Sequence, residues 1–575
     1  MLILFFGCLL ATGNLPIIEL QLTKKSFESD ESLQIETTNG SIQGSKEKTI
    51  NNMTFYKFVG VPYAKPPIYQ LRFKNPQPLS NWSGIVNATV PASCCAGIDL
   101  GNFDIDQLLS SGSEDCLYLN LYTTKKPKSE IKNKLAVMVY FHGGAFVGGC
   151  GNNLNPDFFM EENVVLVIPN YRLSIFGYLS TEDLESPGNY ALKDGIAVLK
   201  WVQLNIHKFG GDPNRVTIFG QSSGAANVNA LLLSQNAKSL FHNVILMSGT
   251  SLAFWSIQLE ARNIAFNVGL AVGIETNNSE YLIRTLRKLD RNMLKQSELS
   301  VFLLNAARFL THGIPLAINI EPNHKDAILT KYPLEILQDG SFNKVPVMIG
   351  VMKKEAIFYD RIIKMLRPFL GIFNLSPSSI IRFTNNLKHR RIVALKIFNY
   401  FFNTTDITQA KDKDLKEFVS EEAYRRPAMK EATLISRHCP VYFFEFTYQG
   451  KIGLDFIRRF LGKSFKRNPN YSGATHMEDI PYLFNIGDMK NNKGEVEFAK
   501  KLTRVYTNFA KTSNPTPTRD PFLDNATWPR IIPGKFPYLN LGRHFSQVSN
   551  NYNDENFQFW ENLYNKYGEK PFKVF

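Results

Sequence analysis

The chain of 575 residues lacks several features that would place it in a specialised class of protein. After its first residues, no apolar run approaches the roughly 20 residues of a transmembrane helix, so we predict no membrane anchor. No fixed-period repeat and no Pro/Gly/Ser-rich linker occurs, which favours one large domain over an array of small ones. Charged residues are only 20% and hydrophobic residues 44%, which excludes a disordered chain and supplies a large core.

Cysteine is also scarce, with six in the whole chain, too few for a disulfide-dense scaffold. Cys8 would be removed with an N-terminal leader, and the remaining five form an odd set. At least one thiol therefore stays unpaired or is joined to another molecule. The sequence does not determine whether Cys150 and Cys439 form disulfides.

The net charge of +14 raises the question of an anionic partner. Basic residues cluster at 388–391 and again between 458 and 467. No aromatic–basic recognition motif accompanies either cluster, so we interpret both as solvated faces and predict no nucleic-acid partner.

The N-terminus has the pattern of a secretion signal. An apolar run from Leu2 to Ala11 is followed by small residues, although the usual basic start is missing, and we predict a signal peptide over 1–13. Residues 14–35 are predicted to be a polar arm and 36–575 the folded domain. Nine sequons fit export to an extracellular location. They are Asn39, Asn52, Asn81, Asn87, Asn277, Asn374, Asn403, Asn470 and Asn525.

Apolar strands alternate with amphipathic helices along most of the chain, a pattern typical of a mainly parallel sheet with helices on both faces. The N-terminal part, 35–58, instead reads as small hairpins with Asn-Gly and Asn-Asn turns. Residues 255–340 are predicted to be a helix-rich insertion, and 361–437 are helical with no assigned packing. The predicted strands are 134–141, 164–169, 216–219, 243–247, 344–351 and 440–447, and the predicted helices are 188–205, 225–233, 496–510 and 557–567.

The segment Gly220-Gln221-Ser222-Ser223-Gly224 lies between a predicted strand and a predicted helix. Gly-x-Ser-x-Gly in that context is typical of a nucleophile elbow, where glycines relieve crowding around a strained serine. The alternative is an ordinary glycine-rich turn. Ser222 is therefore the candidate nucleophile.

A serine nucleophile requires a base and a carboxylate that orients it. His476 lies in a small-residue loop after a strand and is the candidate base, with His142 as its rival. Glu355 follows a strand end and is the candidate acid, with a surface glutamate as the alternative interpretation. The oxyanion would be bound by backbone N–H groups, for which Gly144, Ala145 and Ser223 are the candidates.

Many segments together resemble the type-B carboxylesterases, the family that includes cholinesterases, insect esterases and juvenile hormone esterases. The resemblance rests on segments 58–67, 71–73, 113–120, 142–146, 170–177, 209–224, 346–355 and 473–484. It implies an α/β-hydrolase fold whose helical insertions form a gorge. It also implies Ser222, Glu355 and His476 as the catalytic triad and Gly144, Ala145 and Ser223 as oxyanion donors.

The resemblance further implies a disulfide from Cys116 to an upstream cysteine. Cys94 is the expected partner, with Cys95 as the alternative. Two ion pairs are implied as well, Arg72 with Glu114 and Arg172 with Asp194.

Some residues depart from the family pattern. Gln221 replaces the acidic residue usual in cholinesterases, and the tryptophan that stacks on choline is missing, so cholinesterase activity is not expected. Gln221 matches juvenile hormone esterases, but Ser223 and Gly195 do not. Ala356 and Ser174 replace glycines, and a Cβ strains the backbone wherever φ is positive.

The sequence thus predicts a secreted serine carboxylesterase that hydrolyses small-molecule esters through an acyl-enzyme, with no metal or organic cofactor. One alternative is a hydrolase resembling juvenile hormone esterase. Another is a non-catalytic, neuroligin-like binding protein on the same fold. A third is an esterase that binds its substrate and turns it over slowly.

Overall fold

The structure is a computed structural model that describes residues 33–98, 111–126, 133–305, 313–375, 386–548, 552 and 554–569. The predicted signal peptide and nearly all of the predicted arm lie outside the described residues. The first described strand, β1, begins at Gln34, just before the predicted start of the domain.

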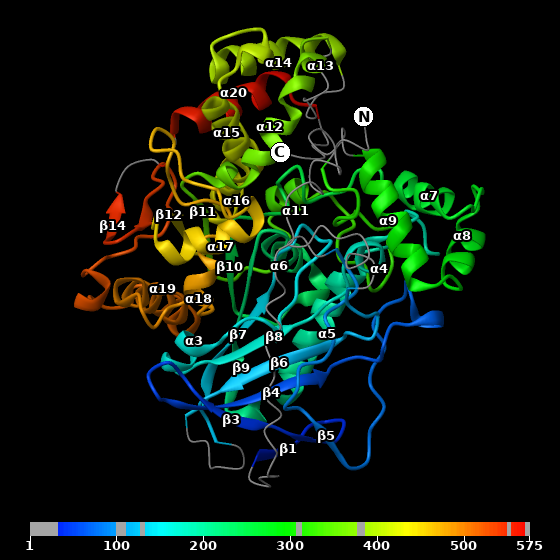
Figure 1. Ribbon diagram of the computed structural model, residues 1–575, viewed down its shortest axis with the longest axis vertical. Coiled ribbons are helices and arrows are strands. Elements are labelled where there is room, and N and C mark those ends of the chain that lie inside the picture. The colour runs from blue at the N-terminus through cyan, green and yellow to red at the C-terminus, as the bar shows by residue number, and fades with distance from the viewer. Residues whose placement is uncertain are drawn as a thin grey trace.

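Two β-sheets are present in the described part of the chain. The larger has eleven strands in the order β14-β13-β12-β11-β10-β9-β7-β8-β6-β4-β3, and the smaller has the order β1-β2-β5 (Figure 1). The strands are β1 Gln34–Glu36, β2 Ser41–Gln43, β3 Ser45–Lys48, β4 Thr54–Pro62, β5 Ile85–Asn87, β6 Tyr118–Thr123, β7 Leu135–Phe141, β8 Val165–Pro169, β9 Gly211–Gln221, β10 Asn243–Met247, β11 Val347–Met352, β12 Val441–Phe446, β13 Tyr538–Leu541 and β14 Phe545–Val548.

The central strands of the larger sheet are parallel, as predicted. Every neighbouring pair from β8 through β7, β9, β10, β11 and β12 to β13 is parallel. The strands outside this block pair antiparallel: β14 with β13 at one edge, and β6, β4 and β3 at the other. Strands β13 and β14 have no counterpart among the predicted elements.

Helices cover both faces of the larger sheet, again as predicted. The α-helices of the described residues are α3 Asp157–Glu161, α4 Ser174–Tyr178, α5 Tyr190–Asn205, α6 Ser223–Leu233, α7 Ala261–Ala271, α8 Ser279–Leu286, α9 Arg291–Asn305, α11 Pro333–Asp339, α12 Asp360–Leu366, α13 Gly371–Leu375, α14 Leu387–Phe402, α15 Asp412–Ser420, α16 Arg426–Ile435, α17 Lys451–Leu461, α18 Ile480–Leu483, α19 Lys493–Thr512 and α20 Asp554–Tyr567.

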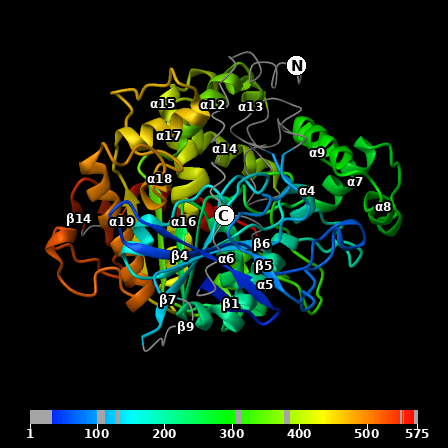
Figure 2. The same cartoon turned by 60° about the horizontal axis from the view of Figure 1, so that its bottom comes forward.

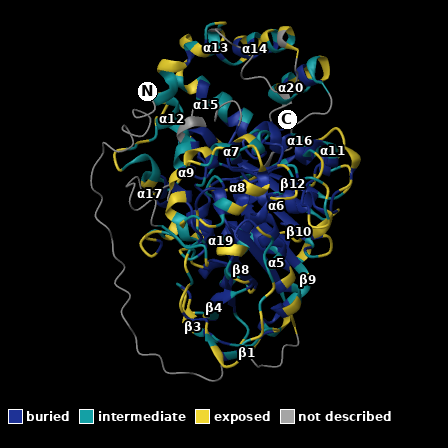
Figure 3. Ribbon diagram, turned by 90° about the vertical axis from the view of Figure 1, so that its right-hand side faces the viewer, coloured by how far each residue is buried: buried dark blue, intermediate teal, exposed yellow. Residues whose placement is uncertain are grey.

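Side chains of one strand alternate between two cores, because successive residues of a strand point to opposite faces. In β7, Val137 and Val139 belong to a core shared with α5, α6 and α16. Met138 and Tyr140 belong to the opposite core, shared with α3, α18 and α19. Figure 3 shows the result as a buried sheet with exposed residues at the periphery.

The hairpins predicted near the N-terminus are confirmed. Strands β1 and β2 pair antiparallel around the Asn39-Gly40 turn. Strands β3 and β4 pair antiparallel around a turn in which Asn52 has φ 65°. Asparagine tolerates this left-handed conformation better than most residues, so Asn-Gly and Asn-Asn pairs in the sequence indicate turns.

Two helical regions flank the sheet. Helices α7, α8 and α9, from the predicted insertion, lie together on one side in both Figure 1 and Figure 2. Helices α12 to α16 account for the region of unassigned packing, and α14 contacts the C-terminal helix α20. There the guanidinium of Arg426, at the start of α16, lies 4.3 Å from the ring centroid of Trp560.

Both predicted ion pairs form, and both are buried. Arg72 meets Glu114 at 2.6 Å and Arg172 meets Asp194 at 2.6 Å. The Arg172 side chain also donates to the Lys74 carbonyl at 2.7 Å, so this pair joins two loops to α5. Removing one partner of such a pair leaves an uncompensated charge in the interior, which is costly.

We predict that Asp194→Asn lowers the free energy of unfolding by about 3–5 kcal/mol. The matched control is Glu280→Gln, which breaks an ion pair with Arg284. The side chains of this pair are exposed, 68% for Glu280 and 61% for Arg284. The control should change stability by less than about 0.5 kcal/mol. Urea denaturation of both variants measures the two losses of unfolding free energy. Equal losses would show that burial does not determine how much the Arg172–Asp194 pair contributes to stability.

Candidate active site

Ser222 occupies the sharp turn between β9 and α6. Its backbone has φ 58° and ψ −127°, a conformation that a residue with a Cβ rarely adopts. Its N–H donates to the Met247 carbonyl at 2.8 Å, and its carbonyl accepts from the Ala226 N–H at 3.0 Å. The neighbouring strand β10 and the first turn of α6 therefore hold the strained conformation in place.

The flanking glycines are required by close backbone contacts. A Cβ on Gly224 would lie 2.1 Å from the Phe141 carbonyl oxygen, and one on Gly220 would lie 2.5 Å from the Gly224 carbonyl carbon. Both distances are far below van der Waals contact, so neither position accepts a side chain. This geometry is that of the predicted nucleophile elbow, not of a loose glycine-rich turn.

The three candidate triad residues converge. The His476 Nε2 atom lies 2.9 Å from the Ser222 Oγ, and its Nδ1 lies 2.8 Å from the Glu355 Oε2. The exposed fractions are 9% for Ser222, 2% for His476 and 1% for Glu355, so the chain of contacts is shielded from bulk water. Glu355 is thus a buried partner of the imidazole, and the surface-glutamate interpretation is wrong.

Backbone contacts fix the Glu355 carboxylate and its neighbours. The Met352 N–H donates to Glu355 Oε1 at 2.8 Å, which leaves Oε2 to face the imidazole. The Thr475 hydroxyl donates to the Glu355 carbonyl at 2.9 Å, and the His476 N–H donates to the same oxygen at 3.3 Å. Glu355 and His476, the candidate acid and base, are therefore held together through their backbones as well as their side chains.

The expected strain at two replaced glycines is present at only one of them. Ala356 does not have a positive φ, and its N–H donates to the Ser420 hydroxyl at 3.0 Å. Ser174 does, with φ 50°. Its side chain hydrogen-bonds the buried Glu298 carboxyl group, and its N–H donates to the Phe146 carbonyl at 2.8 Å.

Burial sets the protonation of the neighbouring titratable groups. Desolvation lowers the pKa of His142 to about 4, so this imidazole is neutral near pH 7. The His142 ring stacks on the Tyr171 ring with 4.5 Å between ring centroids. His142 directly precedes the glycine loop that begins at Gly143. Burial, and secondarily the charge of Glu355, raise the pKa of Asp479 to about 8. Asp479 therefore holds a proton at neutral pH.

The candidate oxyanion donors Gly144 and Ala145 lie in a loop packed against the nucleophile. A Cβ on Gly143 would lie 3.2 Å from the Ser222 Cβ. The backbone of Gly144 has φ 133°, and that of Ala145 has φ 53°. The third candidate, Ser223, directly follows the nucleophile and begins α6.

Several side chains around the imidazole were not among the predicted site residues. The Gln221 Nε2 lies 3.3 Å from the His476 Nε2, whereas the sequence analysis used Gln221 only to compare the chain with cholinesterases and juvenile hormone esterases. The rings of Tyr359 and Tyr424 lie beside His476, with centroids 6.1 Å and 4.8 Å away. Tyr424 belongs to the region 361–437, for which the sequence analysis predicted helices but no packing. The many aromatic residues of that region were the signal that could have pointed to a role near the site.

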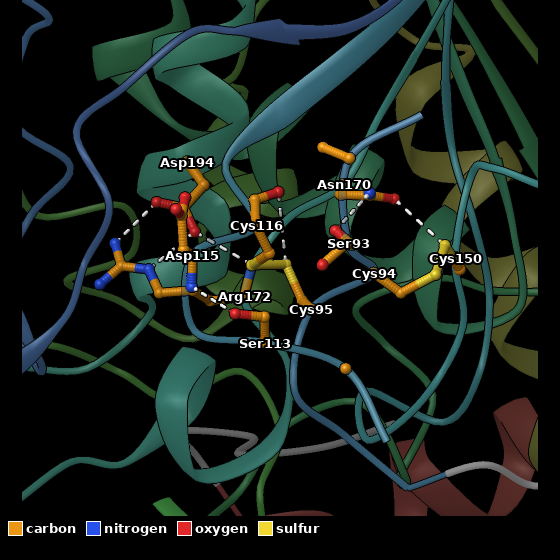
Figure 4. Close-up of a disulfide and its surroundings, with 12 residues drawn as sticks. Ser93, Cys94, Cys95, Ser113, Asp115, Cys116, Cys150, Asn170, Arg172 and Asp194 are labelled. Carbon is orange, nitrogen blue, oxygen red and sulfur yellow. Dashed lines mark hydrogen bonds and ion pairs between the residues drawn. A yellow bond between two sulfur atoms is a disulfide. The ribbon is translucent and has the colours of Figure 1, made fainter. Parts of the chain in front are cut away.

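The predicted disulfide between Cys94 and Cys116 is wrong. Cys116 pairs with Cys95, the stated alternative, and Cys94 pairs with Cys150 (Figure 4). Cys95 forms a β-bridge with Ser113, and adjacent residues of extended chain point in opposite directions. Cys95 therefore faces Cys116 while Cys94 faces the segment that carries Cys150. Cys439 is the free cysteine of the described residues, and Cys8 lies outside them.

The predicted sequons are accessible to different degrees. Most of their asparagines are exposed, namely Asn52, Asn81, Asn87, Asn277, Asn403, Asn470 and Asn525. Asn39 and Asn374 are partly buried, and both already hydrogen-bond neighbouring residues. Glycosylation at all nine sites remains a prediction.

Within the described ranges, no group of three or more His, Cys, Asp and Glu side chains could hold a metal ion. None of the helices in those ranges is long and apolar enough to cross a membrane.

Comparison with known proteins agrees with this geometry. The profile of the carboxylesterase family matches residues 31–560. Juvenile hormone esterase of Tribolium castaneum is 32% identical over 84% of each chain, and esterase FE4 of Myzus persicae is 30% identical over 89% of this chain and 88% of its own. The solved structure of juvenile hormone esterase from Manduca sexta, with OTFP covalently attached, superposes with a TM-score of 0.79 at 26% identity. It covers 93% of this chain and 100% of that one.

The chain belongs to the carboxylesterase family and has the α/β-hydrolase fold. It is a carboxylic ester hydrolase, which removes the non-catalytic binding protein as an interpretation.

The cysteine pairing can be tested by alkylation. Burial raises the pKa of the Cys439 thiol to about 12, which keeps it in the unreactive thiol form. We expect iodoacetamide to label Cys439 slowly in the native protein and rapidly after unfolding without reductant. Peptide mapping should recover Cys94 with Cys150 and Cys95 with Cys116. Recovery of a Cys94–Cys116 peptide would contradict the pairing described above.

Proposed function

We propose that the chain is a secreted, glycosylated serine esterase that cleaves small-molecule carboxylic esters through an acyl-enzyme formed on Ser222. The observation that carries the proposal is the buried chain of contacts from Glu355 through His476 to the Ser222 hydroxyl. Its two distances lie in the hydrogen-bond range that a nucleophile and its base require.

The proposed proton path follows from the contacts of the imidazole. Glu355 accepts the Nδ1–H of His476, which leaves the Nε2 lone pair directed at Ser222. As Oγ attacks the ester carbonyl carbon, Nε2 takes the hydroxyl proton and Glu355 stabilises the imidazolium. Collapse of the tetrahedral intermediate releases the alcohol, which receives the proton from Nε2.

Deacylation repeats the cycle with water. His476 removes a proton from a water molecule that attacks the acyl carbon, and the proton then returns to Ser222 Oγ as the carboxylic acid leaves. We assign the N–H groups of Gly144, Ala145 and Ser223 to bind the oxyanion in both steps. The packing of the 143–146 loop against Ser222 supports that assignment.

Export is supported by several independent features. The apolar leader at 1–13, the mostly exposed sequons and the two disulfides all fit an oxidising extracellular compartment. In this proposal 14–35 forms an arm ahead of a single catalytic domain at 36–575.

We predict that Ser222→Ala lowers kcat for p-nitrophenyl acetate by roughly 10³-fold or more, because no other group replaces the attacking oxygen. Ser234→Ala is the matched control, since Ser234 is a buried serine at the other end of α6 and should retain activity. Mass spectrometry after organophosphate treatment should find the adduct on Ser222. Full turnover by Ser222→Ala would reject the mechanism.

Pre-steady-state kinetics separate a fast esterase from one that mainly sequesters its ester. A stoichiometric burst of p-nitrophenol followed by a negligible steady rate would indicate sequestration.

A narrower function is hydrolysis of a juvenile-hormone-type ester. The juvenile hormone esterases among the similar proteins and the placement of Gln221 beside His476 support it. In that case kcat/KM for a juvenoid methyl ester should exceed that for short p-nitrophenyl esters. A preference for the short esters would favour a general carboxylesterase.

A further inference from the structure

His476 makes its polar contacts through its ring nitrogens, at the ring edge, to Glu355, Ser222 and the Gln221 amide, so the two ring faces depend on packing. Contacts to Glu355 and Ser222 hold two points on the ring edge, and rotation about the line joining them remains possible. What packs on the faces therefore decides whether Nε2 stays directed at Oγ.

Three aromatic rings surround these faces. Tyr424 lies with its centroid 4.8 Å from that of His476 at an interplanar angle of 40°, and Tyr359 lies 6.1 Å away at 32°. Phe358 approaches edge-on at 5.8 Å and 63°. Tyr424 is the nearest of the three and is itself buried, so it is the principal packing surface of the imidazole.

The two tyrosines form one unit. Their rings stack at 6.3 Å with an interplanar angle of 19°, and their hydroxyl groups hydrogen-bond each other. Because the two hydroxyl groups bond each other, what the pair contributes beside His476 is its aromatic rings. Tyr359 ends the same short helical turn, Glu355–Tyr359, that begins with the candidate acid.

Tyr424 is held in place from its other side. The Trp255 ring lies 5.8 Å from it, and the Trp255 indole N–H donates to the Ala423 carbonyl at 2.8 Å. Tyr424 belongs to a single π-helical turn, Glu421–Arg425, inserted between α15 and α16. Such turns are rare and frequently occur at functional sites, because the extra residue redirects the side chains around it.

We propose that Tyr424, supported by Tyr359, is a positioning residue for His476 that holds the ring over Ser222 and stabilises its imidazolium form. The inference rests on the triad mechanism proposed above. The π face of an aromatic ring carries partial negative charge and attracts a cation within about 6 Å, most strongly where water is excluded. In the proposed mechanism His476 gains a positive charge when it takes the Ser222 proton, so this attraction strengthens in the transition state.

The test compares a variant that removes the ring with one that removes only the hydroxyl. For Tyr424→Leu we expect kcat for p-nitrophenyl acetate to fall about tenfold or more, equivalent to about 1.4 kcal/mol of barrier. KM should stay within about threefold, because the ring acts through the imidazole. Tyr424→Phe keeps the π face and should restore kcat to within about threefold of the parent protein.

Tyr359→Leu provides a second measurement that does not depend on replacing the buried Tyr424. It removes the supporting ring and should lower kcat by about threefold, again with little change in KM. Thermal unfolding of every variant verifies that it is folded under the assay conditions.

The outcomes distinguish this inference from the mechanism beneath it. Parental kcat in Tyr424→Leu, with Ser222→Ala inactive, would overturn the positioning role and leave the triad intact. Loss of activity in Tyr424→Phe equal to that in Tyr424→Leu would also overturn it, since the hydroxyl would then be the important group. An active Ser222→Ala would overturn both proposals.

Discussion

The contact between His476 and Ser222 depends on the parallel register of the sheet. Ser222 follows β9 and Glu355 follows β11, and the pairings of Gln221 with Met247 and of Met247 with Gly350 place the end of β9 level with the last residues of β11, which ends at Met352. The carboxyl ends of adjacent parallel strands meet at one edge, which is where open α/β sheets bind their ligands. A shift in register would separate Glu355 from Ser222 and leave the His476 imidazole without one of its partners.

His476 reaches that edge by a different route. It lies well beyond the end of β12, after α17 and a long loop, and returns to the sheet through a hydrogen bond from the Lys354 N–H to the Ala474 carbonyl at 2.9 Å. In the same loop, the Thr475 hydroxyl donates a hydrogen bond to the Glu355 carbonyl. The candidate base is thus positioned by contacts with the residues around the candidate acid, which tie the two segments together.

Strain and close packing occur together at this edge. Ser222, Ala145 and Phe146 all have positive φ, a conformation that costs free energy for residues with side chains. Gly220, Gly224 and Gly143 let the backbones of the elbow and the neighbouring loop pack against each other. Stored strain of this kind persists only where surrounding structure over-determines it, and here β10, α6 and the 143–146 loop do so.

Local pattern was sufficient to predict the turn at Ser222 between a strand and a helix and the central strands, whereas Glu355 and His476 were singled out as its partners by the family resemblance. Apolar runs, turn residues and the spacing Gly-x-Ser-x-Gly reflect backbone geometry that acts over a few residues, so they can be read without the fold. Only the tertiary structure decided that Cys95 and not Cys94 meets Cys116, and that Tyr424 from a π-helical turn lies on His476. Those contacts depend on which way a side chain points after distant segments have packed, and no local periodicity encodes that direction.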